Sequence, residues 1–387
     1  MSLLRRLVAA GVLLVASACG VRSGSWIGPP DRIAPGVEFY RSVDSSLVEH
    51  AGPIAVFLLK TDPSQVRIAS ALSNDRVLEA ETVLEMAGRK RALAAVNGGF
   101  FNTLNGEPAG LLKVGGELVS DASAPRGAVV VERQSAGRDL LTFDRLAAKV
   151  WMEVETADER WSVPIAGVDT TRERGKVMLY TPAYRPDTDT APTGTEWVLD
   201  GQPLVVTSIR RQAGRTPIPP GGAVLSYGGT NPPDELAALE EGARVTFHTK
   251  WQSDFGTPDV RLEASTDIIN GAGLLRRGGK DVADWKAEAL PIATFVEARH
   301  PRTLIGQDRS GAVWLIAVDG RQPDYSIGMR FSELSRLADR LELVDALNLD
   351  GGGSTTMVVR GRMVNRPSDP GGRAVSDAVL VVPRGEP

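Results

Sequence analysis

The feature that most constrains the fold is a short apolar run that ends at once in a glycine-rich or Asp-Gly turn. The feature occurs three times, with turns at residues 97–99, 319–322 and 350–353. Apolar runs this short are typical of buried strands. Because a sheet carries the loops that follow its strands to its edges, the three turns are expected to meet in one functional site.

Short strands broken by turns dominate the rest of the pattern, most clearly between Val129 and Lys250. Helical spacing is confined to residues 77–90 and to a stripe from Phe331 to Leu341, for which Ser332 is the expected cap. No repeat of fixed period is present. We predict an α+β fold, a single strand-dominated catalytic domain with a few packed helices.

The N-terminus predicts export. Two arginines precede an uncharged apolar run at residues 7–18, and Cys19 follows Ala-Ser-Ala. This pattern is typical of a lipoprotein signal peptide at residues 1–19, with Cys19 as the lipidation site; an ordinary signal peptide cleaved nearby is the alternative. Residues 20–36 are rich in Gly, Ser and Pro and predict a flexible tether, so a single catalytic unit is expected at residues 37–383.

Composition excludes several classes of function. The 387 residues carry a formal net charge of −4 and no block of like charges, so nucleic acid is not an expected partner. Cys19 is the single cysteine, which rules out disulfides and thiolate metal sites in the body. The expected setting is the bacterial cell envelope, with the protein held on the membrane by its N-terminal lipid anchor.

The first turn is Asn97-Gly98-Gly99, followed by two phenylalanines. Paired glycines let the backbone approach a ligand closely, and the Asn97 amide offers both a donor and an acceptor. A tight structural turn that returns its aromatic residues to the core explains the same residues equally well.

The second segment contains two arginines. Arg302 and Thr303 precede an apolar run, and Arg321 follows the Asp319-Gly320 turn at the end of the next one. Guanidinium groups match phosphate oxygens in bidentate geometry, so Arg302 and Arg321 are candidate phosphate ligands. If this segment is considered alone, the simpler interpretation is that both arginines are solvated surface residues.

The third segment is the most specific, because it combines the Asp350 carboxylate with Gly351, Gly352, Gly353 and the Ser354 hydroxyl. Consecutive glycines can aim backbone N–H groups at one point and form an anion-binding nest. A purely structural turn remains the alternative, since glycine is the default residue of any strained loop.

These motifs resemble those of the phosphodiester glycosidase family. The resemblance is ordered and covers most of the body, with one departure at Asp169, where the family often has Asn; no role is assigned to that loop. The matching segments are NGGFF at 97–101, HPRTLIG at 300–306, VDGRQ at 318–322, NLDGGGS at 348–354 and VNRPSD at 364–369. The family implies hydrolysis of a sugar-1-phosphodiester at the anomeric C–O bond, with a phosphorylated glycan or glycopolymer as substrate.

A phosphate monoester is a weakly basic leaving group, so one carboxylate suffices as base or nucleophile if cations hold the phosphate. We expect Asp350 or Asp319 to act at the anomeric carbon and Arg302 and Arg321 to bind phosphate. Asn97 is expected to orient a sugar hydroxyl or N-acetyl group. Arg373, near the C-terminus, is favoured as a solvated surface residue.

Two other functions remain open at this stage. One is a metal-dependent phosphodiesterase that cuts the P–O bond; only three histidines are present, none at ligand spacing, although Asp319 and Asp350 could bind Mg²⁺ or Ca²⁺. The other is a surface lipoprotein that binds phosphosugars without turnover. We expect no cofactor and no resident metal.

Overall fold

The structure, a computed structural model, describes residues 26–282 and 284–384. Strands dominate it and a few helices pack against the sheets, which confirms the predicted α+β class. The α-helices among the described residues are α1 (Val83–Arg89), α2 (Asp234–Ala237), α3 (Asp259–Ala264) and α4 (Phe331–Arg340).

The first sheet runs through the centre of the body and contains two of the predicted apolar runs. Its strands lie in the order β1 (Asp31–Ala34), β2 (Val37–Ser42), β3 (Val56–Thr61), β22 (Val313–Val318), β21 (Arg302–Asp308), β23 (Leu343–Asn348), β19 (Leu274–Arg277) and β20 (Lys280–Asp281). Every residue of β22 is buried, because both faces of the sheet are covered. Helix α4 covers one face with its apolar stripe of Leu334, Leu337 and Ala338.

The second sheet packs on the other face of the first. Its order is β25 (Arg362–Met363), β24 (Met357–Val359), β6 (Ala94–Asn97), β27 (Asp377–Pro383) and β4 (Val66–Leu72). Val96 and Val379 join Leu315 and Ala317 of the first sheet in one core cluster. Helix α1 closes the outer side, and the short pair β5 (Glu81–Thr82) and β26 (Ala374–Val375) lies beside it.

The third sheet extends out of the body and carries a second lobe. Its order is β12 (Gly167–Val168), β13 (Val177–Tyr180), β16 (Ala223–Tyr227), β14 (Gly194–Asp200), β15 (Val205–Ala213), β17 (Arg244–Ser253), β10 (Leu140–Glu155), β9 (Ala122–Glu132), β18 (Asp267–Asn270), β7 (Leu112–Val114) and β8 (Glu117–Ser120), and β11 (Arg160–Pro164) pairs with β10.

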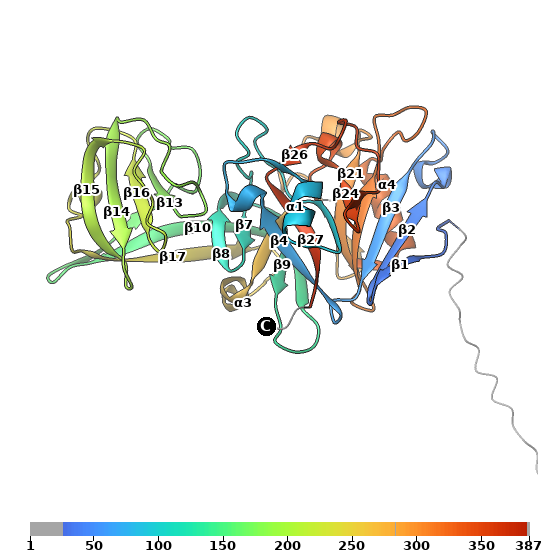
Figure 1. The fold of residues 1–387 in the computed structure, drawn as a ribbon, viewed down its shortest axis with the longest axis horizontal. Helices are drawn as coiled ribbons and strands as arrows, with labels where there is room; N and C mark the ends of the chain where they lie inside the picture. The colour runs from blue at the N-terminus through green and yellow to red at the C-terminus, as the bar shows by residue number, and fades with distance from the viewer. Residues whose placement is uncertain (1–25, 283, 385–387) are drawn as a thin grey trace, which may run out of the picture.

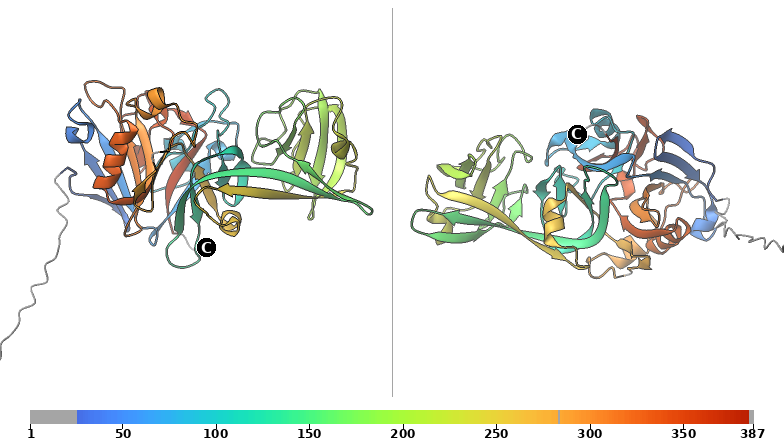
Figure 2. Two further views of the ribbon diagram at one scale, coloured as in Figure 1. Left: turned by 180° about the vertical axis from the view of Figure 1, so that it is seen from behind. Right: turned by 90° about the horizontal axis from the view of Figure 1, so that it is seen from below.

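The long strands β10 and β17 form an antiparallel ribbon that leads from the body to this outer lobe, as Figures 1 and 2 show. The outer lobe, residues 160–243, has its own apolar cluster around Trp197 and Leu225. The assignment of residues 37–383 to one catalytic unit therefore stays a prediction about function, and within that unit the chain builds two lobes.

Three local predictions need correction. The predicted tether ends too late, because residues 31–34 form β1; Gly36, at φ +71°, turns the chain so that β1 pairs with β2. Helix α1 begins at Val83, where Thr82 caps it by accepting the Glu85 N–H. Helix α4 begins at Phe331, so Ser332 lies inside its first turn and is not the cap. The predicted signal peptide, with Cys19, and tether residues 20–25 lie outside the described residues.

Among the described residues, no helix combines the length and apolar character needed to cross a bilayer.

Candidate active site

The three motif loops meet at one edge of the two packed sheets. Strand β21 runs antiparallel to β22 and β23, so the start of β21 lies beside the ends of the other two. The Asp350 N–H donates to the Gly98 carbonyl at 3.1 Å, and the Gly352 N–H donates to the Pro301 carbonyl at 2.9 Å. The structure thus places loops that are about 250 residues apart in direct backbone contact.

A cleft of about 370 Å³ opens where the loops meet. Its walls combine one carboxylate, several cationic groups and the glycine loop. The lining residues are Pro291, Thr294, Phe295, His300, Pro301, Arg302, Arg321, Asp350, Gly351, Gly352, Gly353 and Arg373.

Asp350 is the carboxylate of this cleft. Burial between the loops raises its pKa to about 6, although the Ser354 hydroxyl, the Gly351 N–H and Arg373 all favour the ionised form. The Gly351 N–H donates to Asp350 Oδ1 at 2.8 Å. Ser354 Oγ lies near this carboxylate but makes no hydrogen bond of normal geometry within the described chain. The Asp350 side chain is therefore held in place and remains ionised at neutral pH.

Arg321 supplies a cation that no carboxylate neutralises among the described residues. Its guanidinium lies over the bare backbone of Gly352, where a side-chain carbon would come within 2.9 Å of Arg321 Nη2. The residue itself has φ +60°, a left-handed conformation that is uncommon for a long side chain. This turn directs the Arg321 guanidinium over the glycine loop and into the cleft wall.

Arg373 is a second cation at the cleft, contrary to the expectation of a solvated surface residue. Its guanidinium forms an ion pair with Asp369, with Nη2 to Oδ2 at 2.8 Å. The pair lies against Gly353, since a side-chain carbon there would come within 2.4 Å of Arg373 Nη2. A third group, His300, has its Nε2 2.8 Å from the Thr294 carbonyl, and burial lowers its pKa. His300 is therefore neutral at physiological pH.

Arg302 reaches the cleft, but most of its guanidinium is bound inside the protein. Nε donates to the Met329 carbonyl at 2.9 Å, and Nη2 donates to the carbonyls of Phe295 and Ala298 at 2.5 and 3.0 Å. The group also lies over the rings of Phe295 and Phe331, with Cζ 5.0 and 4.8 Å from their centroids. Burial, with a contribution from Arg321, lowers its pKa to about 9. A bidentate phosphate contact through Nε and Nη2 is thus not available without breaking these bonds.

Asp319 does not line the cleft. Its carboxylate is buried and accepts hydrogen bonds from Asn365 Nδ2 at 2.7 Å, the Arg366 N–H at 2.8 Å and the Tyr325 hydroxyl at 3.2 Å. Burial raises its pKa to about 6. The geometry makes Asp319 an anchor for the segment at 365–366, behind the turn that carries Arg321.

Asn97 and Thr303 also face inward. Asn97 Nδ2 donates to the Asp350 carbonyl at 2.8 Å, and its Oδ1 accepts from Thr303 Oγ1 at 2.7 Å. Both side chains are buried, so they hold the loops together and do not face a substrate. The predicted anion nest is likewise largely satisfied within the protein, since the N–H groups of Gly351 and Gly352 already have partners.

Residues 193–382 match the phosphodiester glycosidase family. This segment belongs to that family. The chain is 33% identical over 139 residues to the human N-acetylglucosamine-1-phosphodiester alpha-N-acetylglucosaminidase, a match that covers 35% of this chain and 27% of the human enzyme. The aligned segment thus spans about a quarter of that relative.

Two solved structures have the same fold. One, from Synechocystis, covers 92% of this chain and 64% of its own length, with a TM-score of 0.75 and 22% identity. The other, from Burkholderia pseudomallei, covers 86% of this chain and 74% of its own length, with a TM-score of 0.69 and 26% identity.

The phosphodiester glycosidase segment includes one residue that the sequence analysis missed. Asp377, at the start of β27, is fully buried and accepts from the Gly99 N–H at 3.1 Å and from Ser376 Oγ at 2.6 Å. Burial raises its pKa, and its charge in turn raises that of Asp350. The register that pairs Ala378 with Asn97 brings it here, and nothing local in the sequence reveals that pairing.

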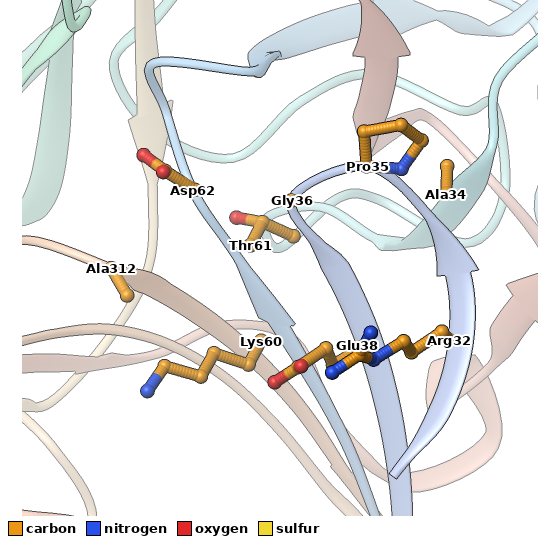
Figure 3. Close-up of a pocket in the computed structure, with 9 residues that line it drawn as sticks. All are labelled: Arg32, Ala34, Pro35, Gly36, Glu38, Lys60, Thr61, Asp62 and Ala312. Carbon is orange, nitrogen blue, oxygen red and sulfur yellow. The ribbon is translucent and has the colours of Figure 1, made fainter.

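A different hollow, of about 520 Å³, lies over β1, β2 and β3 (Figure 3). The side chains of Arg32, Glu38 and Lys60 lie along it, and Lys60 Nζ is 3.5 Å from Asp308 Oδ2. None of the motif loops lines it. Across the residues that the structure describes, no cluster of three His, Cys, Asp or Glu side chains is arranged to hold a metal ion.

Proposed function

We propose that this chain hydrolyses a sugar-1-phosphodiester at the anomeric C–O bond and releases the sugar from a phosphorylated glycan or glycopolymer. The name of the human relative, an N-acetylglucosamine-1-phosphodiester alpha-N-acetylglucosaminidase, supports N-acetylglucosamine as the sugar. The observation that carries the proposal is the cleft in which the Asp350 carboxylate and the unneutralised Arg321 guanidinium lie together.

The division of labour follows from the chemistry of the leaving group. A departing phosphate monoester is a weak base, so it needs cations more than it needs a proton. Arg321 is free to bind its oxygens, and Arg373 can join it by sharing or leaving Asp369. Asp350 acts at the anomeric carbon, either on a water molecule or directly.

Asp350 is suited to this role because its pKa of about 6 leaves it ionised, yet more basic than an ordinary carboxylate, at neutral pH. Asp319 and Arg302 act in this proposal through position: Asp319 fixes the segment beside Arg321, and Arg302 fixes the loop at 295–302. Because the neutral His300 ring donates its Nε2–H to the Thr294 carbonyl, its Nδ1 is left to accept a hydrogen bond at the cleft wall.

The decisive experiment is hydrolysis of UDP-N-acetylglucosamine and of a glycosyl phosphodiester in water enriched in ¹⁸O. C–O cleavage places the label in the released sugar, whereas P–O cleavage places it in the phosphate. Label in the phosphate, with activity lost on chelation, would replace the proposal by a metal-dependent phosphodiesterase. Saturable binding with no released sugar at any pH would indicate a binding protein.

Variants then test the assignment of the carboxylates. Asp350→Asn is expected to abolish sugar release. Asp319→Asn is expected to retain turnover but to lower stability, because both Asp319 oxygens accept hydrogen bonds and an amide has only one oxygen. Asp339→Asn, an exposed carboxylate on α4, is the matched control. Equal loss of turnover in the Asp319 and Asp350 variants at matched stability would contradict the division proposed here.

We also propose that the protein is exported and held at the membrane of the cell envelope through lipid on Cys19. Support comes from the sequence pattern at residues 1–19. Metabolic labelling with a radioactive fatty acid should mark the wild type and leave Cys19→Ser unlabelled; a labelled Cys19→Ser protein would contradict the assignment.

A further inference from the structure

A larger polar hollow, of about 810 Å³, lies where the outer lobe meets the body, and the proposed reaction does not use it. We call it the inter-lobe hollow. Leu78 and Asn105 line it from the body, and the outer lobe provides the rest: Thr171, Arg172, Arg174, Tyr184, Arg185, Thr188, Asp189, Thr190, Ala191, Thr193, Gly228, Gly229 and Thr230.

The wall on the outer lobe is built around a fully buried carboxylate, Glu196. Its Oε1 accepts from Thr190 Oγ1 at 2.7 Å, from Ser226 Oγ at 2.9 Å and from Thr188 Oγ1 at 3.0 Å. Arg172 Nη1 lies 3.7 Å from the same oxygen. A buried charge is tolerated only when it is paired and hydrogen-bonded, so this network fixes the loops around the hollow in one arrangement.

The wall on the body belongs to the loop that also supports the active-site cleft. This loop leaves β6 at Asn97, which is bonded to Asp350, and its residues Phe101 and Pro108 pair across a short bridge. Glu107 then accepts from Thr171 Oγ1 at 3.0 Å and from the Thr171 N–H at 3.4 Å. One continuous segment of about ten residues thus connects the cleft with the inter-lobe hollow.

The free groups of the hollow favour an anionic sugar. Arg174 is exposed and has no ion pair within the described chain, while Arg185 shares its charge with Asp189 at 2.8 Å. Among the residues that line the hollow, three are arginines and only Asp189 is a carboxylate, so positive charge predominates in the lining itself. Glu196 and Glu107 are bonded to threonines of the walls and are not among the lining residues. Tyr184 and Leu78 supply apolar surface and the threonines supply hydroxyls, the combination that binds sugar rings and their substituents.

We propose that the inter-lobe hollow binds a second phosphosugar unit of a polymeric substrate whose terminal unit occupies the cleft at Asp350. The inference rests on the proposed function for the identity of the substrate class. Two linked contacts raise apparent affinity because the second becomes intramolecular once the first has formed. A substrate of several units should therefore bind more tightly than a single glycosyl phosphodiester.

The test compares a single N-acetylglucosamine phosphodiester with an oligomer of N-acetylglucosamine 1-phosphate units. For Arg174→Ala combined with Arg185→Ala, we expect KM for the oligomer to rise about tenfold or more, while KM for the single unit and kcat for both stay unchanged. Arg244→Ala, an exposed arginine of β17, is the matched control. Equal KM values for the two substrates in the wild type, or equal effects of the double variant on both, would overturn the inference.

Direct binding separates this inference from the proposed reaction. The oligomer is titrated into Asp350→Asn protein with and without the two arginine substitutions, and an uncharged oligosaccharide of equal length serves as a second probe. Loss of oligomer binding on substitution supports the hollow even if the wild type proves inactive. Equal binding of charged and uncharged oligomers, or no change on substitution, contradicts it.

Discussion

Asp377 occupies the space that a side chain on Gly98 would need. A carbon built onto Gly98 would lie 1.8 Å from Asp377 Oδ2, and the Gly98 N–H donates to the Asp377 carbonyl at 2.9 Å. Because the Gly98 carbonyl also accepts the N–H of Asp350, one glycine connects the two carboxylates of the site.

Gly98→Ala should therefore move both carboxylates. Overpacking of this kind costs about 1–3 kcal/mol in the free energy of unfolding, and we expect kcat to fall at least tenfold as Asp350 shifts. Chemical denaturation and steady-state kinetics measure the two effects. Gly88→Ala is the control, because an added carbon meets nothing within 4 Å in α1 and should stabilise by about 0.5–1 kcal/mol. Wild-type kinetics in Gly98→Ala would contradict the coupling.

Ionisation of Asp350 should have opposite effects on activity and on stability: as the pH rises, the rate of hydrolysis should increase and the contribution of Asp350 to the free energy of unfolding should decrease. Its pKa is raised from 3.8 to about 6, so the folded state binds the proton more tightly than the unfolded chain does. Its contribution therefore favours folding below pH 4 and is lost as the pH rises through 6, whereas the base or nucleophile role requires the ionised form above 6.

Asp350→Asn should accordingly raise the melting temperature at pH 7 relative to wild type, with a smaller gain at pH 4, while kcat falls by about 10²–10⁴. The wild-type rate should rise with pH through about 6. Thermal denaturation at the two pH values and a pH–rate profile provide the measurements. A destabilised Asn variant at pH 7 would show that the charge is better compensated than its surroundings indicate.

Arg321 should govern substrate binding through charge. Removing a charged hydrogen-bond donor typically costs about 1.5–3 kcal/mol, so Arg321→Ala should raise KM for a phosphodiester by about 10- to 100-fold. The salt dependence of KM should weaken in the same variant. Arg362→Ala, exposed on β25, serves as the control. An unchanged KM and salt dependence would remove Arg321 from the phosphate site.

Arg302 should behave differently, because its guanidinium is bound to backbone carbonyls. Arg302→Met leaves those carbonyls without donors and is expected to lower the free energy of unfolding by at least about 2 kcal/mol. KM at a temperature where the variant is folded should change by less than about threefold, since the group carries little of the phosphate contact. A normal melting temperature with a greatly raised KM would restore Arg302 as a phosphate ligand.

The sequence predicts the meeting of the three loops because each apolar run ends in a turn that a sheet edge must hold, as at Val96, Val318 and Leu349. It does not tell which side chains face the cleft. Arg302 and Arg321 have the same chemistry, and only the packing of Phe295 and Phe331 around Arg302 separates their environments. The predicted roles of Asp350, Arg302 and Arg321 stay predictions until turnover is measured.

Other features depend on pairings between distant segments. Asp377 reaches the site only through the register of β27 against β6, and Arg373 reaches it through the same return of the chain. The sequence does not reveal the outer lobe as a separate lobe, because its strands alternate apolar and polar residues in the same way as the strands of the body. Sequence analysis missed β1 because the Pro-Gly turn after it has the composition of a tether. The pairing of β1 with β2, which the structure shows, is what identifies these residues as a strand.

The ribbon of β10 and β17 has a consequence for how this protein can diversify. The chain leaves the body after Ala148 and returns to it at Trp251, and these two residues are direct partners in the ladder. Everything beyond that pair is a single detour with its entrance and exit side by side, so a change in its length leaves the loops that carry Asp350 and Arg321 connected. Such a change must keep the apolar contact in which Met178 and Tyr180 of the outer lobe pack with Leu72 and Leu112 of the body. Preference for substrate length and the chemistry at the anomeric carbon can thus evolve on separate parts of one chain.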